Sequence, residues 1–96
     1  MKITISERAE QNLESIARYL EKEWSVRVRN RFLEALKKKI DKIAKMPHMY
    51  EASSKKKRVR RCVVSKQIAL YYRAKKNEIE FVTIQDTRQN PKKLKL

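Results

Sequence analysis

Two runs of alternating apolar and polar residues, separated by a short polar turn, constrain the fold of this chain most strongly. Residues 67–74 and 79–86 are rich in aromatic and β-branched side chains, and alternation over such lengths is typical of β-strands. The turn between them contains Asn77, the residue there best able to adopt a positive φ. The pattern therefore predicts a β-hairpin. In its second strand we expect Ile79, Phe81 and Thr83 on one face, and Val82 and Ile84 on the other.

Before Pro47 the apolar residues recur with a period of about 3.6, which is the period of a helix, whereas after it they recur with a period of two. Residues 7–23 and 26–45 each carry one apolar stripe, Ser6 and Ser25 are good N-caps, and Pro47 stops the second helix. Two helices joined by so few residues must fold back as a hairpin. The stripes comprise Ala9, Leu13, Ile16, Ala17, Leu20 and Trp24 in the first helix, and Val28, Phe32, Ala35, Leu36, Ile40 and Ile43 in the second. Trp24 is accordingly expected in the core or at its edge.

Two further alternating segments complete the predicted elements. Residues 2–5 read as a short first strand and residues 59–64 as a strand preceding the hairpin. The predicted order is β-α-α-β-β-β, an α+β fold in which a helical hairpin packs on one face of an antiparallel sheet. Ninety-six residues correspond to a single domain, residues 1–96.

The charge of the chain is large and unevenly placed. The formal net charge is +15, with eight Lys/Arg against two Asp/Glu in residues 25–50, and fourteen against four in residues 51–96. This asymmetry indicates a surface that meets a polyanion, either nucleic acid or an acidic protein segment, although a merely solvated surface is the simpler alternative. The candidate partner-binding or polyanion-binding residues are Lys57, Arg58, Arg60, Arg61, Lys66, Arg73 and Arg88.

The hairpin followed by Arg88-Gln89-Asn90-Pro91, after two helices, resembles the RelE/ParE toxin superfamily of bacterial type II toxin–antitoxin modules, and the helical region resembles its ParE branch. The resemblance covers residues 3–91. It implies the same fold as the pattern predicts. It also implies a plasmid-stabilising toxin that inhibits DNA gyrase without being an enzyme and is neutralised by a cognate acidic antitoxin.

The RelE branch suggests an alternative, a ribosome-dependent mRNA endonuclease. Such members carry an arginine on the first hairpin strand and a tyrosine near the C-terminus, and these positions hold Ile68 and Leu94 here. Only Arg88 matches, and one arginine that clamps a phosphate does not cleave RNA. Arg88 has a structural alternative, a salt bridge to Asp86 or Glu80. A third interpretation is a non-toxic nucleic-acid-binding member of the family.

Other chemistry finds little support in the residues. His48 is the only histidine and Cys62 the only cysteine, so no metal-ligand cluster, cofactor site or internal disulfide is expected, and Cys62 reads as a buried apolar residue. Tyr71 and Tyr72 point to opposite faces, which leaves one of them free to stack on a partner. The apolar runs are too short to span a membrane, and the polar N-terminal segment is unlike a signal peptide. We therefore expect a cytoplasmic protein without a membrane partner.

Overall fold

The computed structural model describes residues 2–50 and 58–86. Its elements are β1 (Lys2–Ile5), α1 (Glu7–Glu23), α2 (Val26–Lys45), β2 (Arg60–Ser65), β3 (Ile68–Lys75) and β4 (Glu78–Asp86). The predicted order is confirmed. Both helices have the predicted bounds, and β2, β3 and β4 differ from prediction by at most one residue at either end.

The strands form one four-stranded sheet in the order β1-β4-β3-β2. β2, β3 and β4 are an antiparallel meander, whereas β1 pairs with β4 in parallel, with Lys2 opposite Glu78. The sheet is therefore mixed, not antiparallel throughout. The parallel pair follows from the topology, because two antiparallel helices return the chain to the end of the sheet where β1 begins, and β3 and β4 then reverse it twice. Asn77 turns the β3–β4 hairpin with a φ of 60°, as predicted.

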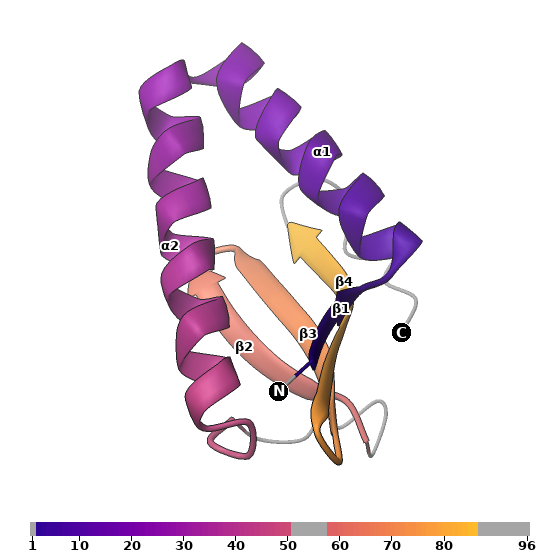
Figure 1. The fold of residues 1–96 in the computed structure, drawn as a ribbon. Coiled ribbons are helices and arrows are strands. Elements are labelled where there is room, and N and C mark those ends of the chain that lie inside the picture. Colours follow the sequence, from indigo (N-terminus) through magenta and orange to yellow (C-terminus); the bar gives the residue numbers. More distant parts are fainter. Residues whose placement is uncertain (1, 51–57, 87–96) are drawn as a thin grey trace.

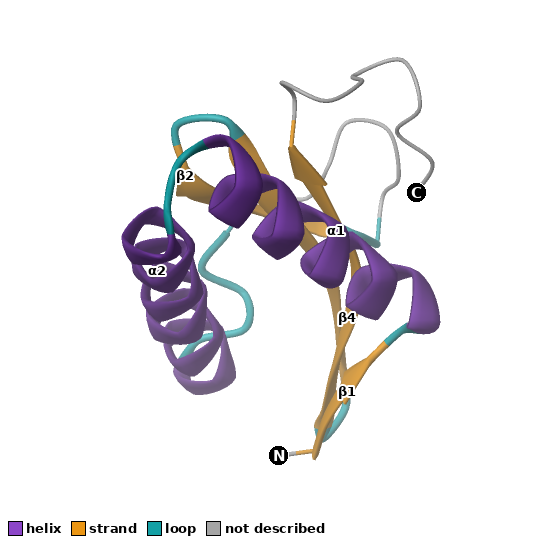
Figure 2. Cartoon of the chain, turned by 90° about the horizontal axis from the view of Figure 1, so that it is seen from above, coloured by secondary structure: helices purple, strands orange, loops and turns teal. Residues whose placement is uncertain are grey.

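Both helices lie on one face of the sheet, joined at a narrow apex from which they diverge (Figures 1 and 2). α1 packs on β4 and α2 packs on β2. Their apolar stripes meet the inward side chains of the strands in a single core. The largest completely buried side chains in that core are Tyr72, Phe81, Ile16, Ile43, Leu70, Ile79 and Cys62. The burial of Cys62 confirms its apolar role.

The alternation of β4 is interrupted at Val82. The pairing between β3 and β4 shifts by one residue opposite the step from Tyr71 to Tyr72, so Val82 is the extra residue of a β-bulge. Beyond the bulge the two faces exchange, and Ile84 joins Phe81 in the core beneath the helices. The prediction that Ile84 and Phe81 lie on opposite faces is therefore wrong, because strict alternation assumes an uninterrupted ladder.

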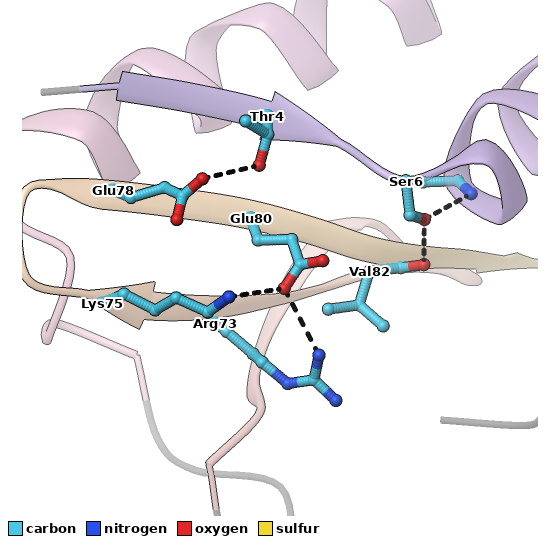
Figure 3. A network of polar contacts seen from close by, with 8 residues as sticks. Thr4, Ser6, Arg73, Lys75, Glu78, Glu80 and Val82 are labelled. Atoms are coloured by element: carbon cyan, nitrogen blue, oxygen red, sulfur yellow. Dashed lines mark hydrogen bonds and ion pairs between the residues drawn. The ribbon is translucent and has the colours of Figure 1, made fainter.

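Where β1 ends, α1 takes over the edge of β4. The Ser6 hydroxyl accepts a hydrogen bond from the Ala9 N–H at 3.0 Å, which caps α1, and donates to the Val82 carbonyl at 2.7 Å (Figure 3). Farther along α1, the side-chain amide oxygen Oδ1 of Asn12 accepts a hydrogen bond from the Ile84 N–H at 3.2 Å. Polar side chains of the first helix thus replace the missing strand partner along this part of β4.

Candidate functional site

The predicted basic residues do not all lie on one face. Arg60 alternates with Cys62 and lies on the helix side of β2, whereas Arg61 lies on the opposite face. Arg58 and Lys66, before and after the strand, are exposed. Arg73 lies on β3, on the same face as Arg61. Two further candidates lie outside the described residues, Lys57 and Arg88.

Arg60 forms hydrogen bonds with the segment that follows α2, residues 47–50. Its guanidinium donates to the Tyr50 carbonyl at 2.6 Å and lies 3.0 Å from Nδ1 of His48. Because a guanidinium only donates, Nδ1 accepts this bond, which places the proton of the neutral imidazole on Nε2. The Tyr72 hydroxyl donates to the Pro47 carbonyl at 2.8 Å. The chain from Pro47 to Tyr50 is thereby held against the sheet.

Tyr50, in this segment, and Tyr72, which binds it, both have raised phenol pKa values. Burial, together with a hydrogen bond to Cys62, raises the pKa of Tyr50 from 10.0 to about 12. Burial also raises the pKa of Tyr72, although the nearby Arg60 opposes the shift. Both phenols therefore hold their protons more tightly than a tyrosine in water does. Within residues 2–50 and 58–86, no three His, Cys, Asp or Glu side chains converge as a metal site would require.

The sheet face opposite the helices carries charges that pair across strands. Glu80 accepts from Arg73 at 3.3 Å and from Lys75 at 3.4 Å, and Thr4 donates to Glu78 at 3.5 Å (Figure 3). These partly exposed ion pairs contribute little stability, of the order of 0.5 kcal/mol each. Their effect is local: Glu80 offsets the charge that Arg73 and Lys75 would otherwise present to a polyanion.

Tyr71 of β3 also lies on the sheet face opposite the helices, beside Arg61. The Arg61 Nε donates to the Tyr71 hydroxyl at 3.3 Å, and the Tyr71 ring is buried against Val59 and Ala69. Tyr71 and Tyr72 are thus both buried, and the expectation that one of them is free to stack on a partner is wrong. Arg61, which is exposed, is the charge that this part of the face presents to solvent.

A third surface is apolar and lies at the edge formed by β1. Ile3 and Ile5 are in register with Ile79 and Phe81 of the core, so they lie on the helix side of the sheet, yet both are exposed. Among the described strands β1 pairs with β4 alone, so no described strand lies along its outer edge. An open strand edge beside exposed apolar side chains is the geometry that accepts an added peptide strand.

Sequence reasoning missed the exposure of two apolar regions. The alternating pattern predicts Ile3 and Ile5 as strand residues, but their strand lies at the edge of the sheet, and the helices pack on β4 and β2 instead. Trp24 follows the apolar stripe of α1 in sequence, yet it lies just beyond the last helical turn and is 65% exposed. Its placement in or beside the core is therefore wrong. A short edge strand and a helix end are the two signals that point to such exposure.

Comparison with known proteins places this geometry in a family. A family model described as ParE toxin of type II toxin-antitoxin system, parDE, matches residues 3–91. No curated protein sequence matches the chain. Neither described helix has the length and apolar character needed to cross a bilayer.

Solved structures share the fold at low sequence identity. A chain of the chromosomal ParDE system from P. aeruginosa superposes with a TM-score of 0.76 at 14% identity, over 90% of this chain and 95% of that one. The YoeB/ParE toxin from Agrobacterium tumefaciens gives 0.67 at 11% identity, over 90% and 98%. A conserved hypothetical protein from Helicobacter pylori gives 0.53 at 13% identity, over 92% and 96%.

Proposed function

The chain belongs to the ParE toxin family of type II toxin–antitoxin systems, and from that premise we propose that it inhibits DNA gyrase without cleaving RNA and is neutralised by a cognate acidic antitoxin. The family match over residues 3–91 carries this proposal. The proposal includes a cytoplasmic location, where the protein would meet gyrase. A role in plasmid stabilisation belongs to the same proposal.

One buried residue favours an inhibitor over a nuclease. Ile68 stands where the RelE branch places an arginine on the first hairpin strand, and its side chain is 2% exposed within the core. A residue in that position cannot reach a phosphate. The side chains of His48 and Tyr72 are engaged in holding the segment after α2, and burial raises the pKa of Tyr50 to about 12.

Paired assays on the induced and purified protein test the mechanism. We expect induction to arrest growth without new cuts in ribosome-bound mRNA, because each missing catalytic group costs about 10²–10⁴ in rate and the losses multiply. We expect the purified protein to inhibit gyrase supercoiling. Primer extension on mRNA from induced cells, run beside a supercoiling assay, measures both. Discrete ribosome-dependent cuts with unaffected gyrase would establish the endonuclease alternative.

The antitoxin is proposed to bind at the open edge of β1 and along the apolar surface beside it. An extended antitoxin segment can pair with the free edge and bury Ile3 and Ile5. The net charge of +15 favours an acidic partner and fast association. We expect the association rate with the product of the adjacent gene to fall about tenfold or more between roughly 0.05 and 0.5 M salt. Stopped-flow measurements would contradict this electrostatic contribution if the rate stayed constant.

A matched pair of substitutions locates that interface. Ile5→Asp should weaken antitoxin binding roughly 30-fold or more, the loss typical of a buried anchor residue. Val63→Asp, on the other edge strand and the other face, should change it less than about threefold. The two side chains are similarly exposed, 41% and 45%, so the substitutions perturb folding comparably. Equal losses in affinity by calorimetry would rule out a specific site at β1.

A further inference from the structure

The turn that joins α1 to α2, here called the apex, has a well-bonded backbone and carries the exposed side chain of Trp24. Only Trp24 and Ser25 connect α1 to α2. The N–H groups of both residues donate to the Leu20 carbonyl, at 3.0 and 3.1 Å, and the Ser25 hydroxyl accepts from the Val28 N–H at 3.1 Å. Just below, Glu21 of α1 pairs with Arg29 of α2 at 3.1 Å. The backbone that carries the indole is therefore fixed from both helices.

Two large apolar side chains at the apex are exposed and are not needed for the core. Trp24 is the only tryptophan of the chain and is 65% exposed, and Val26, the first residue of α2, is exposed beside it. Tryptophan is the residue type most enriched among the side chains that dominate binding energies. Because the apex backbone is already ordered, binding through Trp24 would cost little conformational entropy. These properties describe an anchor for another protein.

The charges around the indole indicate the chemistry of that protein. Between residues 22 and 31, which flank Trp24 in sequence, three exposed cations, Lys22, Arg27 and Arg31, stand against one exposed carboxylate, Glu23, outside the Glu21–Arg29 pair. A partner surface that offers an apolar socket for the indole and acidic groups around it matches this apex in both respects. Nucleic acid matches only the charge.

The apex is separate from the surface proposed for the antitoxin. α1 has 17 residues, so its two ends lie roughly 25 Å apart at 1.5 Å per residue. β1 adjoins the first end and Trp24 the second, and Figure 1 shows the apex of the two helices well away from β1. We propose that the Trp24 apex is the surface through which the toxin binds the protein that it inhibits. That protein is expected to present an acidic surface with an apolar socket for the indole. This inference rests on the proposed toxin function.

Substitution of Trp24 tests the proposal. Trp24→Ala should raise the concentration needed for half-inhibition of supercoiling roughly 30-fold or more, and should abolish growth arrest on induction. Its affinity for the antitoxin should change less than threefold. Trp24→Phe should restore part of the inhibition, and Val63→Ala, an exposed apolar residue elsewhere, should behave as the parent. Arg27→Glu should weaken inhibition more than Lys38→Glu, which reverses an exposed cation farther along α2.

A spectroscopic readout follows the indole directly. The single tryptophan can be replaced by 5-hydroxytryptophan, whose red-shifted absorption distinguishes it from the tryptophans of a partner. Acrylamide should quench its emission in the free protein and in the antitoxin complex, but much less in the complex with gyrase. Retained quenching with gyrase while inhibition is complete would overturn the proposal.

Measurements of growth arrest distinguish a failure of the Trp24 proposal from a failure of the proposal that gyrase is the target. If the parent arrests growth and gyrase is unaffected, the proposed target is wrong, while loss of arrest in Trp24→Ala still supports the apex. If Trp24→Ala arrests growth as the parent does, the apex is not the surface that binds the target, whatever that target is. A tenfold or greater loss of antitoxin affinity in Trp24→Ala would assign the apex to the antitoxin and overturn the proposal.

Discussion

Replacement of Leu36 by Asp is expected to cost about 4 kcal/mol or more of folding free energy. Leu36 lies on the inner stripe of α2, is 4% exposed and belongs to the core. Removing its side chain leaves a cavity worth about 3 kcal/mol, and the carboxylate that replaces it is buried without a partner. Since a domain of this size is typically stable by only about 5–10 kcal/mol, the variant should lose a large share of its stability and unfold at a much lower temperature than the parent. Thermal and urea denaturation measure the loss.

Leu33→Asp is the matched control for that substitution. It makes the same chemical change on the same helix, but Leu33 is 37% exposed, so the new carboxylate remains hydrated. We expect a loss below about 1 kcal/mol. If the Leu36 variant melted like the parent or like the Leu33 variant, the packing of α2 on the sheet would be wrong.

Replacement of Ser6 by Ala is expected to cost about 2 kcal/mol, twice the cost of the same change at Ser25. Both hydroxyls cap a helix, which is worth about 1 kcal/mol. Ser6 also donates to the Val82 carbonyl at the bulge, and that acceptor loses its donor in the variant. Urea denaturation of the two variants isolates the second contribution. Equal losses would mean that the hydrogen bond between Ser6 and Val82 adds nothing to capping.

The sequence predicted the helices and strands well because their limits are set by local chemistry. Ser6 and Ser25 cap the helices through their own side chains, and Pro47 lies just past the end of α2. Asn77 adopts the positive φ that the β3–β4 turn requires. Each of these effects acts within a few residues, so pattern and propensity are sufficient to place it.

The features that the sequence did not reveal depend on contacts between distant segments. At the bulge, the N-cap Ser6 and Asn12 of α1 bind the edge of β4 where β1 ends, although these residues lie 76 and 72 positions from their partners in sequence. Arg60 reads as one of several surface cations, yet the segment from Pro47 to Tyr50 folds back onto it. The exposure of Trp24 depends on which residue begins the turn after α1, and the helical stripe cannot specify that.

The parallel pairing of β1 with β4 has a consequence for synthesis on the ribosome. Lys2–Ile5 is made first, but its partner, residues 78–81, follows about 76 positions later. At about 5–20 residues per second, the first strand waits roughly 4–15 s for its neighbour. Until then β1 lacks its neighbouring strand, and α1 lacks the strand on which it packs. The core beneath α1 therefore closes only after the second strand of the β3–β4 hairpin has been translated.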